Sequence, residues 1–166
     1  FLDFLESLWA FLNQELPATF LAVGVGIPIA LYVDRRITSS RAKKEKTDLL
    51  RLLRGNLEHN LGLLNQIKKN IVEKSIPLYP LDLTTWQTHS TRITSIDRVD
   101  LIQSINETYY ELEHLNRKVN TYFDAVFGFV PEGLVKRLEL LSETILTHID
   151  NLLPRVKETL EQINKG

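Results

Sequence analysis

The sequence predicts an all-α protein with one membrane-spanning helix, on three observations. An uncharged apolar segment is followed by a strongly basic segment, and the rest of the chain repeats its apolar residues at helical spacing. No alternation of Val, Ile or Thr with polar residues suggests a strand. We expect an N-terminal interfacial helix (1–15), a transmembrane helix (16–34), a basic juxtamembrane segment (35–54) and a cytosolic bundle of three long helices and one short helix (55–166).

The first 15 residues, FLDFLESLWAFLNQE, have the pattern of an amphipathic helix. Their apolar side chains recur at helical spacing, and Asp3, Glu6 and Glu15 fall elsewhere on the helical wheel. Trp9 suits the boundary between headgroups and acyl chains. We expect this helix to lie in the outer membrane interface, with a partner-facing helix in an oligomer as the alternative.

Residues 16–33 contain no charged side chain. As a helix they would extend roughly 27 Å, close to the hydrocarbon thickness of about 30 Å. A buried helix of a globular protein, which is the alternative, would normally carry a polar stripe, and only Thr19 and Tyr32 are polar here. A cleaved signal peptide has a basic front end, whereas acidic residues precede this segment. We therefore expect a transmembrane helix.

The charge around this segment predicts its orientation. Residues 35–54 carry 8 basic and 2 acidic side chains. Residues 1–16 carry acidic side chains but no Lys or Arg. The positive-inside rule then places the C-terminal domain in the cytoplasm of a bacterial inner membrane, with the N-terminus outside. Five basic residues nearest the membrane are expected to bind anionic lipid headgroups. They are Arg35, Arg36, Arg41, Lys43 and Lys44.

Small residues recur at every fourth position of the predicted span. Ala18, Ala22, Gly26 and Ala30 form a smooth ridge, through which helices in lipid pack closely. The alternative is that Ala and Gly are simply common in spans. Pro28 removes a backbone donor, so we expect it to kink the helix. The ridge predicts a homo-oligomer, and any pore within it would be lined by small apolar groups.

The cytosolic part has three stretches with heptad-like spacing and no strand pattern. In the first, Leu50, Leu53, Leu57, Leu64, Ile67 and Ile71 form the apolar stripe. The second starts near Asp97, and the third contains Pro154, which should kink or divide it. Between the first two, a short helix around TTWQTHSTRI is expected, capped by Thr84 or Thr85 and anchored in the core by Trp86.

Two asparagines occupy inward positions of these stripes. Asn60 lies in the first stripe and Asn116 in the second. A buried Asn in such a seam commonly fixes register and partner number. The two are expected to pair with each other inside one subunit or with copies of themselves across an interface, and the sequence does not choose between these alternatives.

Few residues suggest catalytic chemistry. The chain has no Cys, which excludes thiol catalysis, disulfides and thiolate metal sites. It has neither a phosphate-binding glycine loop nor a His-Glu-x-x-His zinc motif. Glu111 and His114 have the spacing of half a di-iron carboxylate site, but the second half is missing, so we expect an exposed helix pair. No cofactor, no metal and no enzymatic activity are expected.

The stretch RGNLEH, from Arg54 to His59, fits the Arg-x4-6-His spacing and resembles the motif of HEPN ribonucleases. In that family, helical bundles pair two such motifs across a dimer to build an RNA-cutting site. The resemblance implies Arg54 and His59 as catalytic residues. One span joined to a HEPN-like helical domain is also similar in plan to the membrane accessory proteins of type VI CRISPR systems, which assemble as membrane pores.

The favoured hypothesis is an oligomeric single-pass membrane protein that forms a pore, channel or membrane scaffold. Its partners would be membrane lipids and further copies of the chain. One alternative is a membrane-tethered HEPN-like ribonuclease or RNA sensor. The 12 basic and 15 acidic side chains of residues 55–166 make nucleic acid an unlikely partner for that domain. The other alternative is an accessory subunit of a larger membrane complex.

Overall fold

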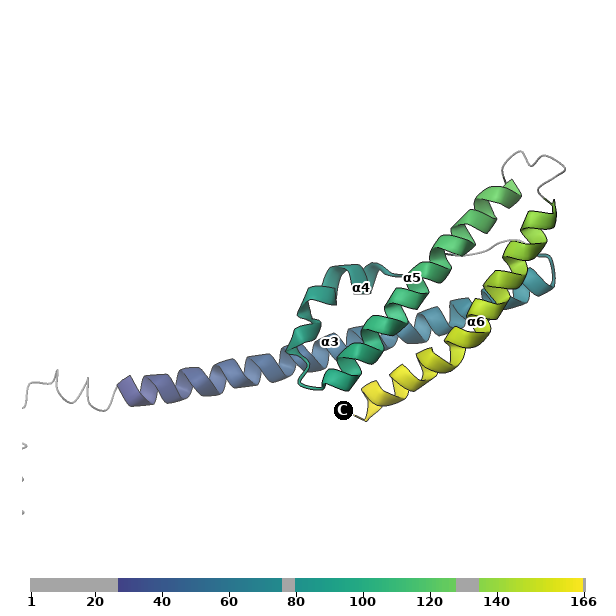
Figure 1. The fold of residues 1–166 in the computed structure, drawn as a ribbon. Coiled ribbons are helices and arrows are strands. Elements are labelled where there is room, and N and C mark those ends of the chain that lie inside the picture. Colours follow the sequence, from purple (N-terminus) through teal and green to yellow (C-terminus); the bar gives the residue numbers. More distant parts are fainter. Residues whose placement is uncertain (1–26, 76–79, 128–134, 166) are drawn as a thin grey trace, which may run out of the picture. The chain divides into compact units, whose positions relative to one another are not determined.

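The structure is a computed structural model that describes residues 27–75, 80–127 and 135–165. These residues are all-α, as predicted, and the chain divides into two compact units, residues 1–45 and 46–166. The elements follow one another as α3 (Ile27–Val72), α4 (Thr84–His89), the 3₁₀ helix η2 (Ser90–Ser95), α5 (Val99–Phe127) and α6 (Val135–Asn164) (Figure 1).

The described part of the first unit is the beginning of α3. All its residues from 27 to 45 are exposed, including the large apolar side chains of Ile27, Ile29 and Leu31. In the described part of the chain, no helix is long and apolar enough to cross a membrane. The predicted interfacial helix and residues 16–26 of the predicted span lie outside the described residues.

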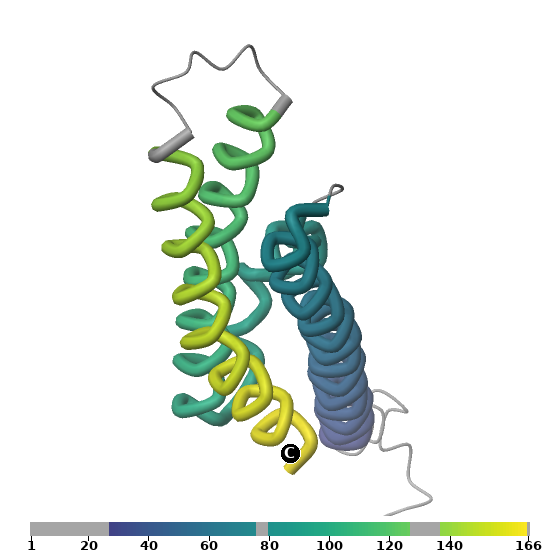
Figure 2. Tube along the Cα trace, turned by 90° about the vertical axis from the view of Figure 1, so that its right-hand side faces the viewer, coloured from purple at the N-terminus to yellow at the C-terminus, as the bar shows by residue number. Residues whose placement is uncertain are grey.

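The second unit is a bundle built from the rest of α3 with α5 and α6. Helices α5 and α6 run antiparallel and side by side (Figures 1 and 2). The apolar stripe predicted for the first long helix is confirmed, since all six of its residues are buried in the core. Burial of these side chains, at about 25 cal/mol per Å² of apolar surface, is the main force that holds α3 against the other helices.

The buried stripe of α5 is broader than a heptad predicts. Beside Ile105, Leu112 and Val119, it includes Thr108, whose hydroxyl lies 2.9 Å from Thr159 Oγ1 on α6. Tyr109, one residue further, reaches α3. Because α5 packs against two helices at once, it buries more than one seam of side chains.

Two details concern a proline inside a helix and a helix cap. Of the two outcomes expected at Pro154, a kink or a division, the division does not occur: α6 continues through Pro154, which is exposed, so the backbone carbonyl that loses its partner there can bind water. The prediction that Thr84 or Thr85 caps α4 is wrong. Leu83 occupies the N-cap position without a side-chain bond, and Asp82 Oδ1 accepts the Thr84 N–H at 2.9 Å instead.

Trp86 packs against the core, as predicted. Its ring lies parallel to the ring of Tyr109, with centroids 4.6 Å apart and an angle of 6° between the planes. Such a stacked pair contributes about 0.5–1.5 kcal/mol beyond the buried area. The contact attaches the short α4 to the middle of α5.

Candidate functional site

The two residues of the HEPN-like motif lie on α3 and are both exposed. Arg54 Nε donates a hydrogen bond to Glu58 Oε1, one turn further along the helix, at 2.8 Å. Five residues of an α-helix correspond to a rotation of about 140° between Arg54 and His59. Within one chain the structure therefore does not bring the two side chains together.

The residues predicted to act in the membrane are described only in part. Of the small-residue ridge, Ala30 is described, and it is exposed on α3. Ala18, Ala22 and Gly26 lie outside the described residues, as does the chain before Pro28 that would show a bend. The five basic residues predicted to bind headgroups are all exposed on the same helix. They are Arg35, Arg36, Arg41, Lys43 and Lys44.

A group of buried and half-buried polar side chains, here called the asparagine cluster, joins α3 and α5 to the segment before α4. It consists of Asn56, Asn60, Asp82, Tyr109 and Asn116. The Asn60 side chain binds both backbone groups of Asp82: its Oδ1 accepts the N–H at 2.8 Å and its Nδ2 donates to the carbonyl at 2.7 Å. Asn116 Oδ1 accepts the N–H of the preceding Leu81 at 2.9 Å. The two asparagines thus bind consecutive residues of one loop rather than each other.

Asn56 connects the remaining members of the asparagine cluster. Its Oδ1 accepts hydrogen bonds from the Tyr109 hydroxyl at 2.8 Å and from Asn60 Nδ2 at 3.2 Å, while its Nδ2 donates to Asp82 Oδ2 at 3.0 Å. Burial raises the pKa of Tyr109, so its hydroxyl stays a donor. The hydrogen bonds from Thr84 lower the pKa of Asp82, which keeps its carboxylate ionised.

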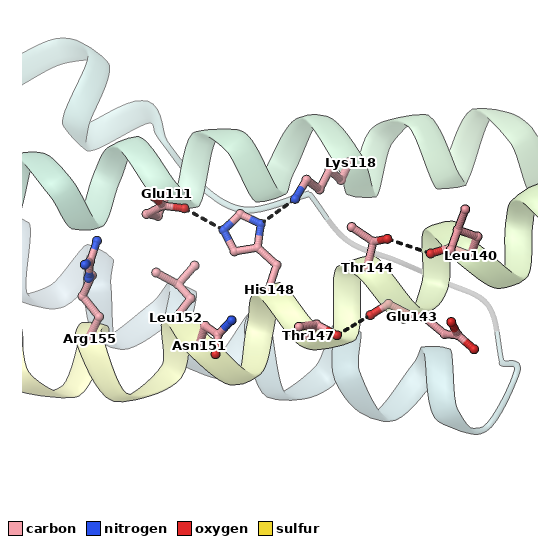
Figure 3. Close-up of a pocket in the computed structure, with 10 residues that line it drawn as sticks. All are labelled: Glu111, Lys118, Leu140, Glu143, Thr144, Thr147, His148, Asn151, Leu152 and Arg155. Carbon is pink, nitrogen blue, oxygen red and sulfur yellow. Dashed lines mark hydrogen bonds and ion pairs between the residues drawn. The ribbon is translucent and has the colours of Figure 1, made fainter.

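A second polar group lies in an open groove on α5 and α6, here called the His148 groove (Figure 3). The groove holds about 660 Å³ of space. The residues that line it come from both helices, and most lie one or two turns apart on one face of α6. They are Glu111, Lys118, Leu140, Glu143, Thr144, Thr147, His148, Asn151, Leu152 and Arg155.

The imidazole of His148 bridges two side chains of α5. Its Nε2 lies 2.8 Å from Glu111 Oε2 and its Nδ1 lies 3.1 Å from Lys118 Nζ (Figure 3). An ammonium group can only donate and an ionised carboxylate can only accept. The partners therefore select the neutral tautomer in which Nε2 carries the proton and Nδ1 accepts from Lys118.

Several charges act on His148. Burial of the ring, whose side chain is 13% exposed, lowers its pKa, and the positive Lys118 lowers it further. The hydrogen bond to Glu111 raises the pKa, but the net direction is downward. His114 on α5, which packs edge-on against Tyr110, also disfavours a second positive charge at this place. At neutral pH the groove thus holds a neutral imidazole between the carboxylate of Glu111 and the ammonium group of Lys118.

The sequence pointed to Glu111 but paired it with the wrong histidine. Glu111 and His114 were expected to form an exposed pair on one helix, whereas both are half-buried and Glu111 binds His148 on α6. One signal was present in the sequence: Glu111 and Lys118 are seven residues apart and so share a face of α5. The identity of the third partner depends on the alignment of α6 against α5, which periodicity does not give.

Within the described residues, no three His, Cys, Asp or Glu side chains are placed to hold a metal ion. The groove contains a single imidazole and one carboxylate in direct contact with it, too few donors for a protein metal site. Compared with models of protein families, with curated proteins and with solved structures, the chain shows no significant match.

Proposed function

We propose that this chain is an oligomeric single-pass membrane protein that forms a pore, channel or membrane scaffold, with the α-helical bundle as its cytosolic domain. The observation that supports this proposal most directly is the first part of α3. Its apolar side chains are exposed, among them Ile27, Ile29, Leu31 and Val33. An exposed apolar stretch on a helix needs either lipid or another helix to cover it.

The continuity of α3 supports the same proposal. Residues Ile27–Val72 form one unbroken helix, so the end of the apolar segment, the basic segment and the first core stripe of the bundle follow one another along α3. Arg35 and Arg36 lie within one helical turn after Val33. This position, directly beside the end of the predicted span, suits contact with lipid headgroups.

Topology is the first test. Because the chain contains no Cys, a single introduced thiol reports without background. We expect Ser7→Cys to react with a membrane-impermeant maleimide in intact cells, and Ser39→Cys to react only after the inner membrane is permeabilised. The protein should also remain in the membrane fraction after alkaline carbonate washing. Release by carbonate, or equal labelling of the two variants in intact cells, would overturn the proposed topology.

Assembly is tested by the mass of the full chain in detergent or nanodiscs. Gly26→Ile adds a bulky side chain on the small-residue ridge, whereas Gly24→Ile makes the same change about 160° away on the helix. We expect a discrete oligomer for the wild type and for Gly24→Ile, and smaller species for Gly26→Ile. A monomer in all three would remove the pore and favour an accessory subunit of a larger complex.

The ribonuclease alternative makes the opposite prediction. If the chain acts through Arg54 and His59, then Arg54→Ala and His59→Ala should abolish RNA cleavage and any toxicity of the expressed protein, while leaving the oligomer intact. We expect neither substitution to change ion flux through liposomes that contain the protein, because both side chains lie on the exposed surface of α3. Loss of toxicity in these variants alone would favour the enzyme.

A further inference from the structure

We infer that the His148 groove binds a small oxyanion, a phosphate or a carboxylate group, between Lys118 and His148, and that binding is coupled to the uptake of one proton by His148. This site is separate from the membrane assembly proposed above, and it depends on the bundle alone. It follows from the charges, the partners and the accessibility of the groove.

The charged groups of the groove lie in a row. Figure 3 shows Arg155, Glu111, His148 and Lys118 following one another along the two helices, with the carboxylate of Glu143 turned away from the imidazole. Arg155 reaches Glu107 only at 3.9 Å, and Lys118 makes no ion pair within 4 Å in the described part of the chain. The lining of the groove carries two acidic and two basic side chains, and Lys118 faces a neutral ring rather than a carboxylate while His148 is neutral.

Lys118 is a half-buried cation whose hydrogen-bond partner carries no charge. Its side chain is half-buried, and in the described residues its hydrogen-bond partner is the Nδ1 atom of His148, a neutral acceptor. An ammonium group has three protons to donate, and its hydrogen bond to an anion is roughly twice as strong as one to a neutral group. An anion that enters the groove would thus replace a weak partner by a strong one.

The same anion would complete the pairing of His148. When Lys118 turns from Nδ1 to the anion, Nδ1 is free to take a proton, and it then donates to the anion as well. Nε2 keeps its bond to Glu111. The result is an alternating arrangement of Lys118, anion, imidazolium and Glu111 in which each charge faces an opposite one. Without an anion, a protonated His148 would face the positive Lys118 directly, which is unfavourable in a half-buried place.

The space and the surrounding groups suit such a ligand. About 660 Å³ is ample for phosphate or acetate, and the groove is open to solvent along α6. Glu111, His114 and Lys118 on α5 act electrostatically on His148. Two further charged side chains, Glu143 and Arg155 on α6, line the groove, and the Glu143 carboxylate is turned away from the imidazole (Figure 3). Thr144 and Thr147 donate to carbonyls of their own helix, so they do not compete for Lys118.

Acetate is the better probe for the proton coupling, because its charge stays constant between about pH 6 and pH 7.5. We would titrate the full chain in nanodiscs with acetate and, separately, with inorganic phosphate, following the imidazole signals of the four histidines by NMR. His148→Gln assigns the signal of interest. We expect saturable binding that strengthens up to about tenfold per pH unit as the pH falls toward 6. The two titrations distinguish a carboxylate from a phosphate as the preferred anion.

Variants separate this site from general attraction to positive charge. Lys118→Met should weaken binding by at least about tenfold, which corresponds to about 1.4 kcal/mol. Lys157→Met removes an exposed lysine of α6 that does not line the groove and should leave binding unchanged. His148→Gln should bind weakly and with no dependence on pH.

Lys118→Arg guards against a simple folding defect, since it keeps the positive charge and should retain binding. Equal affinity in Lys118→Met and wild type would overturn the inference. So would an unchanged pH dependence in His148→Gln, or the absence of saturable binding of either anion to the folded wild-type protein.

Discussion

The asparagine cluster and the His148 groove both tie α5 to a neighbour through polar side chains, but they differ in burial and charge. Asn60 is fully buried, and no buried side-chain atom of the asparagine cluster lacks a hydrogen-bond partner. In the groove, Glu111 is 36% exposed and Lys118 is bound to a neutral ring. Buried donors and acceptors are matched in the asparagine cluster, while in the groove the Lys118 ammonium group faces a neutral partner.

The difference shows how the same residue types serve two purposes. A buried network with every group paired is rigid, because any rearrangement leaves an unpaired group in a low-dielectric surrounding. The asparagine cluster therefore fixes the loop before α4 against α3 and α5. An open network in which a cation has a neutral partner exchanges its partners at little cost. That property suits binding, and substitutions in the two places should separate the two roles.

The largest effect is expected for Asn60→Leu. The change leaves both backbone groups of the half-buried Asp82 without their side-chain partner, so the free energy of unfolding should fall by about 3 kcal/mol. Urea unfolding followed by circular dichroism measures it. Asn65→Leu is the matched control on the exposed side of α3, where a change within about 0.5 kcal/mol is expected. Similar losses in both variants would show that the asparagine cluster is not special.

A smaller effect is expected for Tyr109→Phe, which removes one hydroxyl from the asparagine cluster. Asn56 Oδ1 keeps the bond from Asn60, so the loss should be about 1 kcal/mol. The neighbouring Tyr110 is 60% exposed and offers a control with the same chemistry. Tyr110→Phe should change the unfolding midpoint little. An equal shift in the two variants would contradict the hydrogen-bond assignment.

These residues also show how far the sequence led. The inward position of Asn60 followed from helical spacing, because burial on a helix repeats with a period that the sequence displays. The partner of Asn60 could not be predicted from the sequence, since Asp82 lies in a loop whose path depends on the tertiary packing. Trp86 was predicted as an anchor from its size alone. The cap of α4 was not predicted correctly, because Asp82 accepts the N–H of Thr84 from outside the usual N-cap position.

The His148 groove was harder to predict for a related reason. Glu111 and Lys118 lie on one helix and share a face by simple periodicity. His148 belongs to α6, 30 residues from Lys118 and 37 from Glu111 along the chain. Which α6 residue faces them depends on the loop between the helices and on their relative rotation. Contacts between helices of this kind are set by packing, so a single sequence gives their components but not their pairing.

The change of the free energy of unfolding with pH is expected to be smaller than the effects of Asn60→Leu and Tyr109→Phe. It is also the effect most specific to the His148 groove. Above about pH 6.5, His148 is neutral in both the folded and the unfolded chain and contributes nothing. Burial lowers its pKa in the folded state, so between that lowered pKa and 6.5 the unfolded chain binds more protons. The free energy of unfolding should therefore decrease as the pH falls through this window, and level off below it.

His148→Gln removes the titrating group while keeping a side chain that can donate and accept. The unfolding free energy of this variant should depend less on pH than that of the wild type over the same window, because the other three histidines are present in both proteins. An identical slope would show that His148 is not the group responsible. Acetate adds the decisive step: if an anion stabilises the imidazolium beside Lys118, it should restore part of the stability that the wild type loses on acidification, and restore none in His148→Gln.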